Sequence, residues 1–191
     1  MNYAFQPQEI KKHNVFISFH HKNEDKKNDF ETWHGAHFTS KSVQNGDIDP
    51  DNEDEYTKKL IQEDYISDSS VLIALYGANT YERKHVDWEI SAALSAKVGG
   101  HSGFIILILP DFPVSAFDQS GQYDASLLYP YLHPRTADQI KSGYAKVFFW
   151  PGIYQNLPEV HVPNILQEAF DRRISHKHLI DNSRVQYKNN R

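Results

Sequence analysis

Five short apolar runs recur along the chain, and the stretches between them are polar or have the spacing of amphipathic helices. The runs are Val15–Phe19, Phe38–Val43, Val71–Tyr76, Phe104–Leu109 and Ala145–Trp150. Each has the length of a strand, and the third and fourth are apolar throughout, which is typical of strands covered on both faces. Serine and lysine dilute the second run, so that only its alternation favours a strand.

Helical patterns fill the intervals between the runs. Besides a helix after Tyr76, we expect one helix that ends at His34 or Gly35. Three more helices are expected over Tyr56–Ile66, Thr136–Gly143 and Val162–Ile174. Spacings of three and four residues predict which side chains face the core: Phe30, Trp33, Leu60, Ile61, Ile165, Leu166, Ala169 and Phe170.

The helix after Tyr76 carries a carboxylate beside its apolar stripe. Asn79 or Thr80 can cap its first turn, and Gly99-Gly100 end the pattern. The stripe consists of Val86, Ile90, Ala93 and Leu94. At 100° per residue, Glu89 lies roughly 60° to one side of the first stripe residue, which predicts a half-sheltered carboxylate at the edge of the stripe.

Strands that alternate with helices from Val15 onward predict parallel pairing and right-handed crossovers. We therefore expect a flavodoxin-like, doubly wound α/β fold, with a five-stranded parallel sheet in the order 2-1-3-4-5 and helices on both faces. Ligands of such sheets bind at the carboxyl ends of the strands. The expected strand ends share one rim and are Phe19-His20, Val43-Gln44, Tyr76-Gly77 and Leu109-Pro110.

The length of 191 residues and the hydrophobic content of 39% fit one domain with a sizeable core. We expect a polar lead-in over residues 1–13, a single domain over 14–176 and a basic tail over 177–191. From Arg172 onward there are six Lys or Arg and one Asp. Composition favours a solvated or frayed tail over an arm that binds nucleic acid or the acidic face of a partner. Two further segments are expected to be loops: the acidic stretch Asp47–Glu55 and the irregular, aromatic-rich segment 110–133.

Composition also bounds the function. The net charge of −5 gives no general attraction to nucleic acid or anionic membrane, so small molecules or proteins are the expected partners. Cysteine is absent, which rules out a disulfide framework and a thiol nucleophile and suits a reducing cytosol. The lead-in lacks an apolar signal core, and the aliphatic run Phe104–Leu109 is too short to span a bilayer. We expect a cytoplasmic protein.

The familiar site motifs do not occur. Three local histidine pairs lack a third ligand at a recognisable spacing, so we expect no metal; the pairs are His20-His21, His34 with His37, and His176 with His178. The glycine-rich phosphate loops and the serine-hydrolase elbow are also missing from the sequence. A bound nucleotide would therefore be held by side chains and helix N-termini rather than by a glycine cradle.

Three stretches resemble a known family. Ser67, the run VLIALYG, Asn79-Thr80 and the run VDWEI at positions 86–90 resemble the third strand and following helix of TIR domains. The run VFISFHHKNED at the first strand resembles the bacterial TIR-like group of Thoeris antiphage defence. A later stretch, RTADQIKSGYAKVFFWP, resembles the same group. The first two matches cover Val15 to Pro110.

The resemblance implies a site and a reaction. In NAD-cleaving TIR domains the glutamate of this helix is catalytic, which assigns that role to Glu89. NAD would be the substrate and no further cofactor is implied. The residues expected to hold the substrate are Ser18, Phe19, His20, Tyr76, Asn79, Thr80, His85 and Trp88. Many catalytic members have Trp four residues before the glutamate, where this chain has His85, while Trp88 directly precedes Glu89.

Cleavage of NAD releases nicotinamide, a cationic leaving group that needs no general acid, so one carboxylate suffices. Attack by water gives ADP-ribose, whereas attack by the adenosine half gives a cyclic isomer. The Thoeris resemblance favours the cyclic product, a signal that would activate a separate effector. The resemblance also implies a homo-oligomer. The opposite charges of the acidic loop Asp47–Glu55 and the basic tail could meet between copies, so we predict self-association that weakens with salt. The alternative is a TIR-like or flavodoxin-like module that binds a protein or nucleotide and catalyses nothing.

Overall fold

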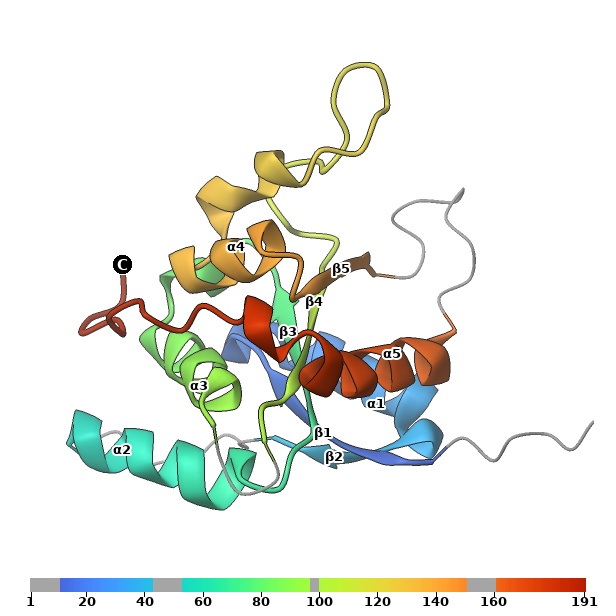
Figure 1. The fold of residues 1–191 in the computed structure, drawn as a ribbon. Coiled ribbons are helices and arrows are strands. Elements are labelled where there is room, and N and C mark those ends of the chain that lie inside the picture. Colours follow the sequence, from blue (N-terminus) through green and yellow to red (C-terminus); the bar gives the residue numbers. More distant parts are fainter. Residues whose placement is uncertain (1–10, 43–52, 97–99, 151–160) are drawn as a thin grey trace, which may run out of the picture.

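The computed structural model describes residues 11–42, 53–96, 100–150 and 161–191. The strands in these ranges are β1 (His13–Ser18), β2 (Phe38–Lys41), β3 (Val71–Tyr76), β4 (Gly103–Ile108) and β5 (Lys146–Phe149). They form one sheet in the order β2-β1-β3-β4-β5, and every neighbouring pair is parallel. The predicted flavodoxin-like α/β fold is confirmed (Figure 1).

Helices cover both faces of the sheet. The α-helices are α1 (Glu24–His34), α2 (Asp54–Leu60), α3 (Lys84–Leu94), α4 (Pro134–Lys141) and α5 (Val162–Ser175). A π-helix, η3 (Ile61–Ile66), continues α2, and short 3-10 helices are η1 (His21–Asn23), η2 (Gly35–His37), η4 (Thr80–Glu82), η5 (Ala125–Tyr131) and η6 (Lys177–Leu179). Helices α1 and α5 lie on one face, and α2, α3 and α4 lie on the other (Figure 1).

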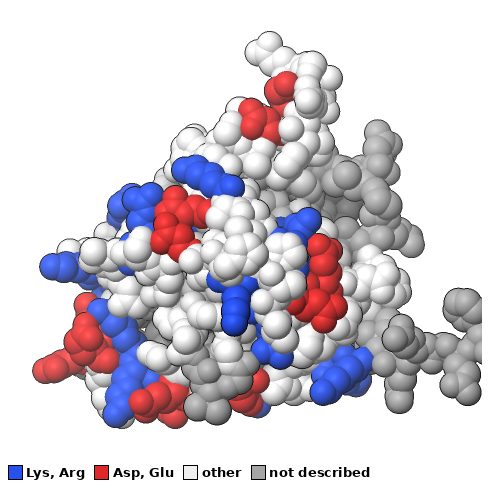
Figure 2. Space-filling view, in the orientation of Figure 1, with Lys and Arg blue, Asp and Glu red and all other residues white. Residues whose placement is uncertain are grey.

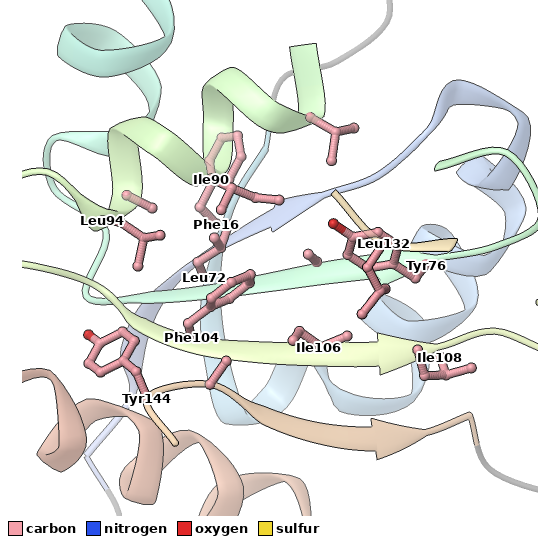
Figure 3. Packing of buried hydrophobic residues seen from close by; sticks show 14 of the residues in the cluster. Phe16, Leu72, Tyr76, Ile90, Leu94, Phe104, Ile106, Ile108, Leu132 and Tyr144 are labelled. Carbon is pink, nitrogen blue, oxygen red and sulfur yellow. The ribbon is translucent and has the colours of Figure 1, made fainter. Parts of the chain in front are cut away.

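The alternation of side chains along each strand divides the core into two layers. Leu72 and Phe104 point toward α3 and pack near Ile90, as Figure 3 shows. Their neighbours Val71 and Ile105 belong to the layer beneath α1 and α5. Because both faces are covered, the ends of the strands are the places where the sheet can meet a ligand.

Two predicted core positions are wrong. Trp33 is 52% exposed, because Phe30 takes the core position of α1 while the Trp33 ring packs only at the edge, 5.5 Å from the ring of Trp150. Leu60 is half-buried rather than buried. The buried pair on this segment is Ile61 and Ile66, five residues apart, a spacing that fits the π-helical turn.

Both ends of α3 differ from the prediction. Neither Asn79 nor Thr80 caps it, because the Thr80 hydroxyl instead accepts a hydrogen bond from Gly77 N and closes the turn that becomes η4. The helix starts at Lys84 after an extended Arg83. It ends at Leu94, before the predicted stop at Gly99-Gly100, of which Gly99 lies outside the described residues.

Some other predictions also fall outside the described residues. They concern the strand end Val43-Gln44, most of the lead-in and the part of the acidic loop from Asp47 to Asn52. The described remainder of that loop is engaged within the chain. The Asp54 carboxylate lies 2.7 Å from the Lys84 ammonium, and the Glu55 carboxylate lies 2.6 Å from the Lys58 ammonium.

The surface carries both signs of charge. On the face drawn in Figure 2, acidic and basic side chains are interspersed, and neither sign forms one continuous field. Within the described ranges, no helix is long and apolar enough to cross a membrane. Across the same part of the chain, no three His, Cys, Asp or Glu side chains are grouped so that they could hold a metal ion.

Candidate active site

A buried serine and a buried glutamate meet at the carboxyl end of β1. Ser18 is the last residue of the strand, and its side chain faces α3, like that of Phe16 two positions earlier. Its hydroxyl donates a hydrogen bond to the Glu89 carboxyl. Glu89 is only 8% exposed, so it lies deeper than the half-sheltered edge that the helical spacing predicted.

Burial changes the chemistry of Glu89. Loss of hydration disfavours the charged carboxylate and raises the pKa of Glu89 from 4.5 to about 8. The hydrogen bond from Ser18 acts in the opposite direction, because it stabilises the charged form. At pH 7 the carboxyl group is therefore mostly protonated in the ligand-free protein, and a positive charge placed beside it would favour ionisation.

Two buried side-chain nitrogens of the described residues, on His20 and Arg83, lack an acceptor. His20 is 2% exposed, and its Nδ1 accepts a hydrogen bond from Lys22 N, which leaves the proton on Nε2. His20 Nε2 and Arg83 Nε have no partner among the described residues. Burial, followed by the charges of His21, Arg83 and Lys22, lowers the pKa of His20 to about 4. His20 is thus a neutral donor at pH 7.

The ends of β3 and β4 are joined by a small polar cluster. The Asp111 carboxylate accepts hydrogen bonds from Ala78 N at 3.2 Å and from the side chain of Asn23 at 3.5 Å. A Cβ atom at Gly77 would lie 2.7 Å from an Asp111 oxygen and 2.9 Å from the Asn23 amide. Any larger residue at position 77 would displace the Asp111 and Asn23 side chains from this cluster.

Tyr76 belongs to the core below this rim. The Nε2 atom of His133 donates to the carbonyl of Arg83 at 3.0 Å, so its Nδ1 accepts from the Tyr76 hydroxyl at 2.7 Å. Thr136 then donates to the Tyr76 oxygen at 2.7 Å. Burial lowers the pKa of His133 to about 4. This network ties the residue before α3 to the end of β3.

The remaining predicted residues lie apart from Glu89. The Trp88 ring is covered by the ammonium groups of Lys84 and Lys58, at 4.9 and 5.0 Å, and its Nε1 donates to Tyr187 O. His85 is exposed, and its ring centre lies 5.0 Å from that of Trp88. Phe19 is half-buried against the layer beneath α1 and α5, whereas Asn79 and Thr80 shape the turn at η4.

The sequence singled out Ser18 and Glu89, which the structure brings into contact, and did not single out several residues of the surrounding polar networks. The residues that it did not single out are Asn23, Arg83, Asp111 and His133. Asp111 carried a usable signal, because it follows a buried strand and must lie at the carboxyl rim. The others come from loops or short helices whose position depends on tertiary packing.

The sheet order, together with a glutamate on the helix after β3 that reaches the end of β1, is consistent with a TIR-like domain. The family model described as Thoeris protein ThsB, TIR-like domain, matches residues 16–112, about half of the chain. The chain belongs to this family, as its residues had suggested. The matched segment includes both members of the buried pair and both unpartnered donors. No curated protein matches the chain.

Proposed function

We propose that the protein cleaves the bond between nicotinamide and ribose in NAD, with Glu89 as the catalytic residue. The observation that carries this proposal is the buried Ser18–Glu89 pair at the carboxyl end of a central parallel strand. A single carboxylate in a dry setting suits a reaction that builds positive charge and needs no general acid. Membership of a TIR-like family supports the same chemistry.

In the proposed reaction the C1′–N bond breaks, its electron pair leaves with nicotinamide, and the ribose carbon becomes positively charged. The ionised Glu89 carboxylate faces that charge and accepts hydrogen bonds from ribose hydroxyls. The positive charge of bound NAD lowers the pKa of Glu89, so substrate binding generates the active carboxylate from the neutral acid of the free protein. Because Glu89 is 8% exposed, NAD reaches it only when the surrounding segments open.

His20 and Arg83 supply donors for the oxygen atoms of the substrate. Their Nε2 and Nε atoms are buried and unpartnered within the described ranges, and a buried donor without an acceptor is costly. The diphosphate and ribose groups of NAD offer the missing acceptors. A neutral His20 and a cationic Arg83 can serve the same oxygens without a glycine-rich loop.

The nucleophile decides the product. Water gives ADP-ribose and releases a proton. Attack by the adenosine half gives a cyclic ADP-ribose isomer, again with release of a proton when the attacking group is a hydroxyl. We favour the cyclic product, acting as a second messenger that activates a separate effector in antiphage defence, because the chain belongs to a Thoeris family. A cytoplasmic location and assembly into a homo-oligomer remain predictions. Asp54 and Arg184, from the two segments expected to attract each other between copies, are already paired within the chain.

The test is chromatography of NAD incubated with the protein, repeated on extracts of infected cells because relatives can be silent until triggered. We expect nicotinamide release or a cyclic product from the wild type. Glu89→Gln keeps the size of the side chain and removes its charge, so the rate should fall roughly a hundredfold to several thousandfold. Glu63→Gln changes an exposed glutamate of η3 in the same way and serves as the matched control.

A non-catalytic binding module is the second candidate. The covered ring of Trp88 favours it, because that ring is not free to stack on a ligand at Glu89. If the wild type is inert toward NAD both in solution and in infected cells, the binding module becomes the better interpretation. If the wild type is active and Glu89→Gln retains its turnover, the catalytic assignment of Glu89 is wrong.

A further inference from the structure

The C-terminal segment Asp181–Arg191, here called the strap, lies along the outer side of α3 (Figure 1). Composition predicted a solvated tail, and many of its side chains are indeed exposed. Its backbone and amide groups nevertheless contact α3 at its beginning, middle and end. None of the strap belongs to the segment matched by the family model, so its contacts are a feature of this chain beyond the family match.

At the beginning of α3 the strap supplies a cap. Arg83 makes no side-chain capping bond, so the first N–H groups of the helix need an outside acceptor. Asn190 provides it, because its Oδ1 accepts from Lys84 N at 3.0 Å. The N–H of Arg191 donates to the carbonyl of Glu82, two residues before the helix, at 3.0 Å.

At the middle of α3 the strap completes a buried ion pair. Arg135 Nε donates to one oxygen of Asp87 at 3.1 Å, and Tyr187 N donates to the other at 2.8 Å. Trp88 Nε1 donates back to Tyr187 O at 2.7 Å. The Tyr187 ring also packs 5.3 Å from His133, which holds the carbonyl of Arg83. A backbone unit of the strap is thus fixed between two side chains of α3.

Near the end of α3 the strap donates to the helix. Asn182 Nδ2 binds the carbonyl of Ser91 at 2.9 Å and the Ser95 hydroxyl at 3.1 Å. The side-chain oxygen of Asn182 accepts from Arg135, the same guanidinium that pairs with Asp87. The contacts at the two ends and the middle therefore act on one rigid element.

Glu89 lies on the other side of that element. It is two positions after Asp87, which places the two side chains roughly 200° apart around the helix. The strap contacts the side of α3 that carries Asp87, and the side of α3 that carries Glu89 contacts β1. We propose that the strap is a positioning device that presses α3 onto β1, with Tyr187 and Asn190 as positioning residues that keep the Glu89 carboxyl on Ser18.

The catalytic meaning of this proposal rests on the proposed function, but its structural part does not. The strap is held mostly by hydrogen bonds rather than by apolar packing, and Val185 in its middle is 82% exposed. Such a segment detaches at a lower free energy than the core. Detachment would let α3 shift and water reach Glu89, and the pKa of Glu89 would then fall from about 8 toward 4.5.

The experiment is an NMR titration of the Glu89 side-chain carboxyl, assigned by its loss in Glu89→Gln. Tyr187→Ala removes the ring and keeps the N–H that binds Asp87, whereas Tyr187→Pro removes both. Val185→Ala is the matched strap control. We expect the Glu89 pKa in Tyr187→Pro to fall by at least about one unit below that in the other two variants.

Equal Glu89 pKa values in all three variants would overturn the proposal, even if Tyr187→Pro melts earlier. If Tyr187→Pro does not fold, the double variant Asn182→Ala with Asn190→Ala decides by the same criterion. Turnover of NAD at pH 9, where Glu89 is ionised in every variant, should fall at least about tenfold in Tyr187→Pro relative to Tyr187→Ala. An inert wild type would count against the proposed function and leave the titration result standing.

Discussion

The Ser18 hydroxyl donates a hydrogen bond to the Glu89 carboxyl and joins residues 71 positions apart in the sequence. This contact links two properties of the site. It fixes the carboxyl at the end of β1, and it partly offsets the effect of burial on the pKa of Glu89. Stability and activity should therefore depend on pH through the same group.

Glu89→Gln should stabilise the protein at high pH. The unfolded chain ionises at about pH 4.5, whereas the folded protein keeps the proton until about pH 8, so wild-type stability falls as pH rises through this window. Glutamine does not titrate and escapes this loss. We expect a gain on the order of 5 kcal/mol at pH 9 and almost none at pH 4, measured by urea unfolding. A gain independent of pH would contradict the assignment of the shift to Glu89.

The pH profile of NAD cleavage should report the same ionisation. If the charged carboxylate is the active form, kcat/KM should rise roughly tenfold per pH unit and level off above about pH 8. Ser18→Ala removes the bond that favours the charge and should move the rising limb to higher pH. Ser40→Ala breaks a hydrogen bond to Glu31 at the surface and should leave the profile unchanged. Identical profiles for both variants would refute a role of Ser18 in tuning Glu89.

Loss of the buried Asp87–Arg135 pair should cost far more than loss of a surface pair. The two side chains are 2% and 1% exposed, so Arg135→Met leaves an uncompensated buried charge and should destabilise by about 3 to 5 kcal/mol. Arg184→Met breaks an ion pair between α4 and an exposed strap residue and should cost less than about 1 kcal/mol. Chemical denaturation at pH 7 compares the two. Similar losses would mean that the buried pair is solvated in the folded protein.

Gly103→Ala should be strongly destabilising. A Cβ atom there would lie 1.9 Å from the carbonyl oxygen of Ala169, so β4 and α5 would have to move apart. We expect a loss of about 3 kcal/mol. Gly35→Ala is the control, because no atom lies within 4 Å of its ideal Cβ and the residue is helical. That variant should be neutral or stabilised by up to about 1 kcal/mol in thermal unfolding, and equal effects would show that α5 adjusts without cost.

The sequence predicted the sheet because its strands are nearly uniform apolar runs. Such runs, alternating with helical spacing, leave few topologies once parallel pairing is required. The ends of α3 were less predictable. Thr80 is a good capping residue in isolation, but its hydroxyl closes a turn with Gly77, and the actual cap comes from Asn190, more than a hundred positions later. Local propensity carries no signal for such a partner.

The burial of Glu89 also escaped prediction for a tertiary reason. Helical spacing placed it at the edge of a stripe, as if α3 had one solvated side. In the structure the side of α3 that carries Glu89 packs on the end of β1, and the opposite side is covered as well, by α2 and the strap around Trp88 and by α4 against Asp87. Every residue from Val86 to Leu94 is buried as a result. Periodicity measures one apolar face and cannot detect a polar segment that packs on the opposite one.

The close joining of β4 to its neighbours bears on how the molecule could be divided for recombinant expression. Residues 16–112 carry the family match and end soon after β4, before β5, α4 and α5. A fragment cut to those bounds would leave the edge of β4 from Ile105 to Ile108 without its partner strand. It would also uncover the side of β4 against which Ala169 packs. An apolar, unpaired edge of this kind promotes pairing between molecules, so such a fragment should aggregate even though it contains the whole segment matched by the family model.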